Sequence, residues 1–480
     1  MPLSRERLVP LIVAVALFME NIDSTVIATA LPAIAADIGT NPLALKLAVT
    51  SYLLALAVFI PISGWMADRF GARTIFRSAI VVFVLGSVGC ASAGALWHFV
   101  LSRFIQGMGG AMMTPVGRLV LLRTVDKSRL VDAMALVTMP ALVGPLLGPP
   151  LGGFITTYAS WHWIFLINVP IGFFGFLLVS RFVENVRAEV PDPFDFIGMA
   201  LVGVAVAGLA FGTSVLGLGF LPRSLVVVLI VVGALAAAAY VVYARRTPTA
   251  VIDLSLFQLP TLRAGVAGGF VFRIGAGALP FLLPLLLQIG LGMTPFESGL
   301  ITLSTAVGAI TMKAAAARVL RRFGFRRTLT VNALLAGGSL GACAAFGLGT
   351  PVWLMVAVLL VGGLFRSLQF TSVNAIAFAE VDPRRMSRAT SLVSVAQQLS
   401  ISTGVAVGAL VVETVLRFKG HESLSAPDFP PGFVVVGCIA VASALLFAQL
   451  PHDAGAEMAA GKPAARKLSR PDKPADQRGQ

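Results

Sequence analysis

Long apolar runs, separated by short polar connections, occupy most of the chain between residues 8 and 450. Their residues do not alternate between apolar and polar at every second position, as barrel strands would. A bilayer core needs about 20 apolar residues in a helix, and the runs are long enough to supply them. The pattern therefore predicts an all-α integral membrane protein with fourteen transmembrane helices. The expected spans are 8–31, 44–66, 75–95, 97–122, 133–157, 162–182, 196–216, 222–244, 264–290, 296–317, 328–348, 352–378, 389–415 and 432–450.

Composition supports this class and excludes others. Of the 480 residues, 57% are hydrophobic and 12% are charged, and the mean hydropathy is +0.90. Polar side chains are thus too few to cover a soluble globule. The net charge of +14 would suit a nucleic-acid-binding protein, but positive residues also accumulate in cytoplasmic loops for topological reasons. No nucleic-acid partner is expected.

The distribution of positive charge predicts the orientation. An even number of spans puts both termini on one side, and the loops on that side collect most of the lysines and arginines. The loops on the other side hold only Lys46, Arg223, Arg417 and Lys419. Both termini are therefore expected in the cytoplasm of a bacterial-type cell, with the protein in its inner membrane. A signal peptide at the N-terminus is disfavoured because Glu20 and Asp23 interrupt the first apolar run.

The sequence lacks the patterns of a metal site, a disulfide or an enzyme. Cys90, Cys343 and Cys438 are isolated in apolar runs, and the four histidines form no HExxH motif. There is no nucleophile and base constellation and no phosphate-binding loop. We expect no cofactor and no enzymatic activity.

A short repeat divides the chain into two halves. The kernel Arg-Phe-Gly-x-Arg occurs at 69–73 and again at 322–326, each time between the second and third spans of a half. Two related halves around a central cavity are typical of alternating-access transporters. The expected parts are a six-helix half at 1–190, an inserted helix pair with linkers at 191–260, a second six-helix half at 261–451, and a disordered cytoplasmic tail at 452–480.

Five motifs in order carry a family resemblance. "GWMADRFGART" provides a loop motif, "LSRFIQGMGGAM" a fourth-span motif and "GPLLGPPLGG" a fifth-span motif. "DSTVIATALPAI" at 23–34 and "SWHWIFLINVPIG" at 160–172 are similar to branch signatures. Together they resemble the major facilitator superfamily, and within it the fourteen-helix drug:proton antiporter branch. The matching residues are Gly64, Asp68, Arg69, Gly71, Arg73, Arg103, Gln106, Gly107, Gly109, Gly144, Pro145, Gly148, Pro149, Gly152 and Gly153.

Physical chemistry suggests a role for two of these motifs. In the loop motif, Asp68 can pair with an arginine or cap a helix N-terminus across the domain interface, which would make it a latch. Ordinary positive-inside topology is the alternative. In the fifth span, glycines every four residues leave a bare stripe for another helix, and the prolines should kink it. The resemblance implies that this bend seals the cavity, whereas simple packing would need the same stripe.

Two acids in the first span are candidate proton carriers. Glu20 and Asp23 lie three residues apart and face one side of a helix. Counted from Leu8 at 1.5 Å per residue, Asp23 lies about 8 Å below the outer face of the core, and Arg103 about 9 Å below it. Desolvation favours a protonated carboxyl group and a nearby arginine favours the charged form, so their competition can switch proton affinity. A static ion pair between two helices is the alternative.

The sequence thus predicts a proton-coupled exporter of small amphipathic drugs or toxic compounds, acting as a monomer on protons and a small-molecule substrate. Export of a metabolite or organic anion, and a non-transporting membrane sensor, remain alternatives. Gln106, Phe18 and Arg273 are expected in the substrate cavity. Arg273 is expected to face Glu20 across the cavity and to pair with it in at least one state, or to meet an anionic group of the substrate instead. A backbone-bonded arginine between helices is the alternative. Glu413 is expected to snorkel to the interface.

Overall fold

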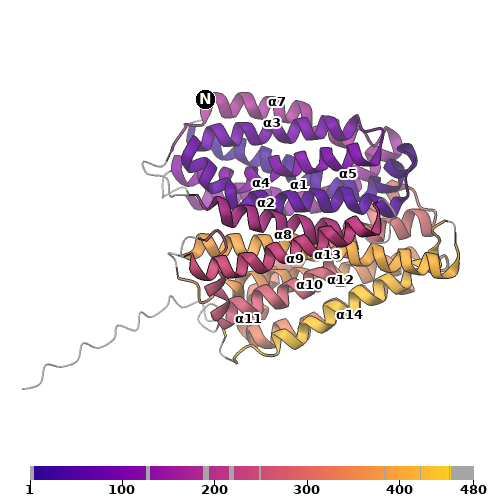
Figure 1. Ribbon diagram of the computed structural model, residues 1–480. Helices are drawn as coiled ribbons and strands as arrows, with labels where there is room; N and C mark the ends of the chain where they lie inside the picture. Colours follow the sequence, from indigo (N-terminus) through magenta and orange to yellow (C-terminus); the bar gives the residue numbers. More distant parts are fainter. Residues whose placement is uncertain are drawn as a thin grey trace, which may run out of the picture.

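The computed structural model describes residues 5–125, 130–187, 194–215, 221–247, 250–382, 385–421, 423–452 and 454–455. Within them the fold is all-α (Figure 1). The α-helices are α1 Arg5–Asp37, α2 Lys46–Phe70, α3 Ala72–Ala91, α4 Leu96–Thr124, α5 Leu130–Tyr158, α6 Trp163–Leu166, α7 Asn168–Phe182, α8 Phe196–Val215, α9 Arg223–Arg246, α10 Pro260–Leu285, α11 Pro295–Ala342, α12 Val352–Ala377, α13 Met386–Lys419 and α14 Pro430–Phe447. Short turns of other helix types are η1 Pro42–Leu45, η2 Leu254–Gln258, η3 Leu286–Gly290, η4 Cys343–Ala345 and η6 Ala426–Asp428.

Eleven stretches of the described residues are long and apolar enough to cross a membrane. Large apolar side chains such as Leu85, Trp97 and Phe173 are exposed on their outer surfaces. Such a surface is suited to lipid rather than water. The chain is therefore a multi-pass helical membrane protein.

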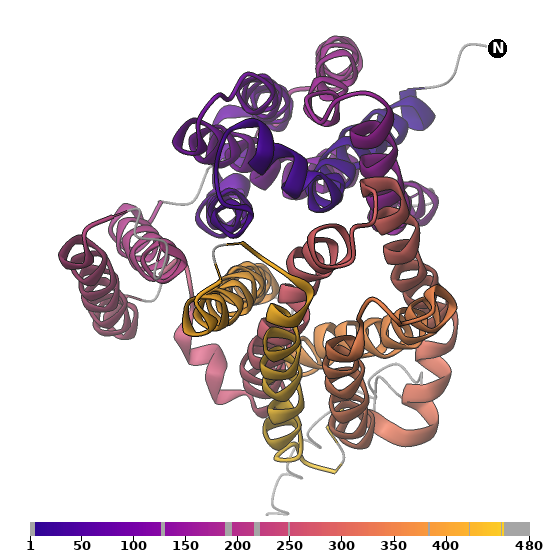
Figure 2. The ribbon, with the colours of Figure 1, turned by 90° about the vertical axis from the view of Figure 1, so that its right-hand side faces the viewer.

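The helices form two bundles with a pair beside them (Figure 2). Helices α1 to α7 pack mainly on one another, and α10 to α14 do the same. Helices α8 and α9 pack together, and α8 also contacts α2 and α13 at the boundary between the bundles. We call α1 to α7 the N-half and α10 to α14 the C-half.

The repeated kernel forms the same local structure in both halves. Gly71 separates α2 from α3 with φ +97°, and Gly324 interrupts α11 with φ +72° and non-helical geometry. Side chains other than glycine rarely adopt positive φ, so each kernel needs its glycine at this one-residue break. The 48 residues of α11 are consequently two helical arms, one on each side of Gly324.

The start of the predicted tail packs on the C-half. Arg326 donates a hydrogen bond of 2.8 Å to His452, and Ala454 is buried near Phe325. Chain order thus extends to at least Gly455, and residues 456–480 of the predicted tail lie outside the described residues.

Candidate functional site

Asp23 lies at the centre of a buried polar cluster in the N-half. Its Oδ2 accepts a 2.8 Å bond from Nη1 of Arg103 on α4. Its Oδ1 accepts bonds from Gln106 Nε2 at 2.7 Å and from Asn168 Nδ2 at 2.8 Å. The same two amides donate to Ser87 on α3. Three helices, α1, α4 and α7, thus meet at one carboxylate, and α3 joins the cluster through Ser87.

This cluster is sealed from solvent in the state described. Asp23 is 2% exposed, and Arg103, Gln106 and Asn168 are each 1% exposed or less. Charged groups removed from water need both a counter-charge and hydrogen bonds, and the carboxylate has three donors. Arg103 and Asp23, which the helical rise places at the same depth, are in direct contact.

Glu20 is connected to the same cluster through an aromatic ring. The hydroxyl of Tyr52 on α2 donates to its Oε1 at 3.3 Å. The Arg103 guanidinium lies over the Tyr52 ring, 4.3 Å from its centroid. Glu20 is only partly buried, so the two acids of α1 lie in different environments on opposite sides of Tyr52 and Arg103.

Arg273 does not contact Glu20 in this state. Its Nη2 donates a 2.7 Å bond to Asn374 of α12, and its guanidinium lies 5.7 Å from the centre of the Phe370 ring. Both partners are neutral and belong to the C-half. The sequence did not identify this partner, because an asparagine in an apolar run does not show which neighbouring helix it faces.

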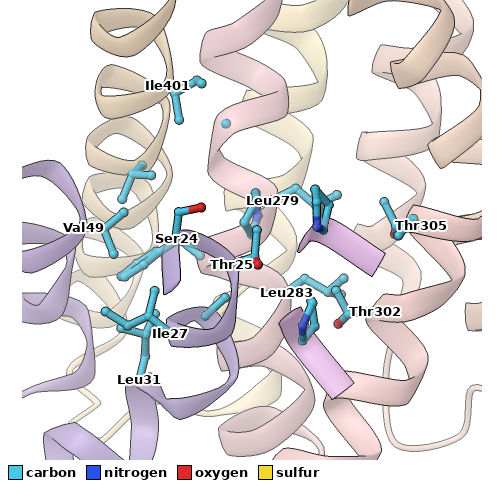
Figure 3. A pocket seen from close by; sticks show the side chains of 18 of the residues that line it. Ser24, Thr25, Ile27, Leu31, Val49, Leu279, Leu283, Thr302, Thr305 and Ile401 are labelled. Carbon is cyan, nitrogen blue, oxygen red and sulfur yellow. The ribbon is translucent and has the colours of Figure 1, made fainter. Parts of the chain in front are cut away.

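A cavity of about 320 Å³ lies between the two halves (Figure 3). Its walls are mostly apolar and come from α1, α2, α5, α10, α11 and α13. The lining residues are Ser24, Thr25, Ile27, Ala28, Leu31, Val49, Leu53, Pro145, Pro149, Gly277, Leu279, Pro280, Phe281, Leu283, Thr302, Thr305, Ala306, Ala309, Ile401 and Val405.

The residues expected in the substrate cavity lie elsewhere in this state. Gln106 bonds to Asp23 inside the N-half, Arg273 bonds to Asn374 inside the C-half, and Phe18 packs against the apolar core. None of the three lines the cavity. A position on the correct helix did not determine which face of that helix meets the cavity.

The glycine stripe of α5 lies directly on α1. A methyl group on Gly144 would lie 2.8 Å from the Asn21 side chain, and one on Gly148 would overlap Thr25. Thr25 and Thr29 donate to the Gly144 and Pro149 carbonyls at 3.2 and 3.3 Å. Such close approach requires bare backbone. The helix α5 is continuous across its prolines from Leu130 to Tyr158.

Gly152 and Gly153, the last two glycines of the fifth-span motif, also make close contacts here. Gly152 abuts the Val26 carbonyl of α1, whereas Gly153 abuts the Pro295 carbonyl at the start of α11. The stripe therefore contacts both halves at once.

One end of the cavity is closed by contacts between the halves. Gln288 donates to the Thr29 carbonyl at 2.9 Å, and the Phe296 amide donates to Thr157 at 3.1 Å. A methyl group on Gly299 would clash with the Pro149 carbonyl. These contacts are on the side where α1 ends, opposite the N-terminus.

A charge pair also links the halves at the closed end. Lys46, the fully buried first residue of α2, lies with its Nζ 3.6 Å from Glu413 Oε2 on α13. Arg417, one turn further along α13, pairs with the other oxygen of Glu413 at 2.9 Å. The expectation that Glu413 snorkels to the interface is therefore wrong: the carboxylate is 7% exposed and held by two cations.

The loop motif lies at the opposite end of the N-half. A side chain on Gly71 would collide with Asn185, whose Oδ1 accepts a 3.3 Å bond from the Thr74 amide. The Ala72 amide donates to the Val186 carbonyl at 3.1 Å, so the segment after α7 caps α3. The remaining motif residues range from exposed to half-buried: Gly64, Asp68, Arg69 and Arg73.

Sequence reasoning missed three members of the site: Ser87, Asn168 and Tyr52. A signal existed for Asn168, which lies inside the signature "SWHWIFLINVPIG". A serine or tyrosine within an apolar run gives no such signal. The described residues contain no group of three His, Cys, Asp or Glu side chains suited to hold a metal ion.

Comparisons with known proteins agree with this architecture. The chain is 40% identical over 452 residues to "Putative multidrug resistance protein MdtD" of Citrobacter koseri, covering 92% of this chain and 94% of that protein. It is 40% identical over 450 residues to the protein of the same name from Escherichia coli strain 55989, with the same coverage.

Two solved structures share the fold at low sequence identity. A D-xylose-proton symporter gives a TM-score of 0.66 at 17% identity, covering 93% of this chain and 98% of that one. A peptide transporter bound to sulfate gives 0.67 at 16% identity, covering 92% and 93%. The sequence pattern of the Major Facilitator Superfamily matches residues 13–260 and 265–473. The chain therefore belongs to the Major Facilitator Superfamily of membrane transporters.

Proposed function

We propose that the protein exports small amphipathic drugs or toxic compounds in exchange for protons. The observation that carries the proposal is the carboxylate of Asp23, buried inside the N-half of a transporter and bonded to Arg103, Gln106 and Asn168. An acid inside a membrane bundle is costly and marks ion pathways. The similarity to proteins named for multidrug resistance supports the choice of drugs.

Asp23 carries the coupling proton in this proposal, and Glu20 relays it to the cavity. Ser24, which lines the cavity, lies four positions after Glu20, so the two share one face of α1. Tyr52 and Arg103 lie between the acids. Protonation of Asp23 releases Arg103 and loosens the contact of α1 with α4, and this biases the halves toward a different arrangement.

The mostly apolar cavity supports an amphipathic substrate. Leucine, isoleucine, phenylalanine and proline make its walls, and the hydroxyls of Ser24, Thr302 and Thr305 add a few polar groups. Such a lining suits small ligands with one large apolar part. Pro145 and Pro149 of α5 form part of this wall, and in this proposal the close packing of the α5 glycines on α1 seals it against leak.

The topology is part of the proposal. We place both termini in the cytoplasm of an inner-membrane protein with fourteen spans, acting as a monomer. A straight 48-residue helix would be about 72 Å long, more than twice the core of a bilayer, so α11 provides two spans around Gly324. Helices α4 and α5, each of 29 residues, provide two more beyond the eleven apolar stretches.

Transport by purified protein in liposomes tests the proposal. With an imposed pH gradient, wild type should accumulate the dye ethidium against its gradient, and Asp23→Asn should lose this while still folding. Asp37→Asn, at the exposed end of the same helix, is the matched control. Undiminished uphill transport by Asp23→Asn would refute the coupling role. If wild type moved neither ethidium nor the organic anion benzoate, a non-transporting sensor would be favoured instead.

A second candidate substrate class is a metabolite or other organic anion. The observation that favours it is the pair of buried arginines in the C-half, Arg273 and Arg366, which contact no acid among the described residues. The same liposomes then accumulate benzoate in place of ethidium.

A further inference from the structure

The fourth helix of each half carries an arginine followed three residues later by a glutamine. These are Arg103 and Gln106 in α4, and Arg366 and Gln369 in α12. The second pair is as well buried as the first, since Arg366 is 6% exposed and Gln369 is fully buried. The polar core of the N-half thus has a counterpart in the C-half.

The counterpart extends to the third helix. In the N-half, Gln106 donates to Ser87 of α3 at 2.7 Å. In the C-half, Gln369 accepts a 2.8 Å bond from Asn332, which lies in the second arm of α11. Each glutamine is therefore fixed by a polar side chain of the preceding helix.

The two cores differ in charge. Arg103 is neutralised by Asp23 from the first helix of its half. The first helix of the C-half, α10, supplies Arg273 instead of an acid. Among the described residues no side chain accepts a hydrogen bond from Arg366, and its buried Nη2 has no partner. Arg273 bonds only to the neutral Asn374, and its Nε also lacks a partner.

Such an arrangement is unstable without a counter-charge. A guanidinium cannot lose its proton in a protein, and a buried charge that has neither a partner nor water is heavily penalised. An anion that reaches Arg366 would recover the penalty of that guanidinium.

Arg366 lies at the depth of the central cavity. Its neighbour Ser367 donates a 2.7 Å bond to the Ala309 carbonyl, and Gly363 abuts the Thr305 backbone. Thr305 and Ala309 both line the cavity, as Figure 3 shows for Thr305. The first arm of α11 therefore lies between α12 and the cavity, and the Arg366 guanidinium is close to Gly362 and Ser339 at the same level.

We propose that the C-half contains an anion-binding site centred on Arg366, which takes a carboxylate group. The apolar cavity takes the hydrophobic body of a ligand whose carboxylate reaches Arg366. Identification of that ligand as a transported substrate rests on the proposed function; the existence of the site does not.

Binding of benzoate to the purified full-length protein tests the site. Calorimetry without a pH gradient or membrane potential should show that benzoate binds. Its neutral isostere benzamide should bind with an affinity at least about tenfold lower. Arg366→Gln should weaken benzoate binding about tenfold or more, and Arg366→Lys, which keeps the charge, should lose less. Arg318→Gln, at an exposed position of α11, is the control and should bind as wild type does.

Three outcomes separate the possibilities. Tight benzoate binding with weak binding of chloride supports a carboxylate ligand, and equal binding of chloride that is lost in Arg366→Gln supports the same site with an inorganic anion. Equal binding of benzoate and benzamide, or unchanged benzoate binding by both Arg366 variants, would overturn the proposal. Asp23→Asn should still bind benzoate, so a failure of proton coupling remains distinguishable from a failure of the site.

Discussion

At the scale of single residues, the two acids of α1 differ through their neighbours rather than their chemistry. Asp23 has three donors and a fully desolvated arginine beside it, whereas Glu20 is partly buried and has a tyrosine hydroxyl. A carboxylate with a charge-assisted bond and two amides is held in one geometry. In this state Asp23 is therefore the more tightly constrained of the two acids.

Outside the spans, Asp253 should make folding stability depend on pH. Partial burial raises its pKa, but bonds from Ser255 and Arg385 outweigh this and lower the pKa below its usual value. Because the native pKa is lower than the unfolded pKa of about 3.9, the charged carboxylate stabilises the fold at pH values above the unfolded pKa. This contribution is lost as the pH falls through the native pKa. Asp253→Asn should therefore cost about 1 kcal/mol at pH 7, and the cost should vanish at low pH. Thermal unfolding of both proteins from pH 7 to pH 3 measures it, and a pH-independent difference would contradict it.

At the scale of elements, the close contact between α1 and α5 requires glycine at several α5 positions, because a Cβ at any one of them would collide with α1. Gly148→Ala should destabilise the protein by about 1–3 kcal/mol, because the new Cβ would overlap Thr25 and separate the helices. Gly338→Ala is the matched control: it is also helical, but its Cβ would meet nothing within 4 Å. Alanine exceeds glycine in helix propensity by about 0.5–1 kcal/mol, so the control should gain stability. Thermal unfolding should give shifts of opposite sign, and equal shifts would show that the stripe is not a close contact.

The sequence was most informative where an element obeys a backbone rule. The repeated Arg-Phe-Gly-x-Arg kernel predicted equivalent positions in the two halves, and both glycines adopt positive φ at a break between helices. The apolar runs located the helices well because each must cover the bilayer. They could not show that the break at Gly324 is so short that two helical arms adjoin in one run of 48 residues.

At the scale of the whole molecule, contacts between distant helices were only partly predictable. Equal depth along two helices was enough to bring Asp23 and Arg103 together. In the state described it did not bring Glu20 and Arg273 together, because the rotation of each helix about its axis also decides its partners. Arg273 turns toward Asn374 instead. Lys46 and Glu413 were assigned to a loop and an interface because each has an outer position, yet they pair across the halves.

That pair should act as a latch on the closed end of the cavity. Lys46 belongs to the N-half and Glu413 to the C-half, so opening this end must separate a buried ion pair. A contact present in only one state biases the equilibrium by its own free energy, and about 1.4 kcal/mol changes the ratio tenfold. Lys46→Ala should therefore populate the state that is open at this end.

Labelling of a cysteine placed at Leu31 in the cavity, in a background without the three native cysteines, measures the opening. In sealed vesicles, an impermeant maleimide added on the side of this end should label Lys46→Ala several-fold faster than the parent. Arg417→Ala provides the comparison, because Arg417 binds the same carboxylate from the same helix, α13. Faster labelling of Lys46→Ala alone fits a latch between the halves. Equal rates in both variants would mean that the pair contributes only local charge balance, and the closed end would then depend on the helix packing around Gly153 and Gly299.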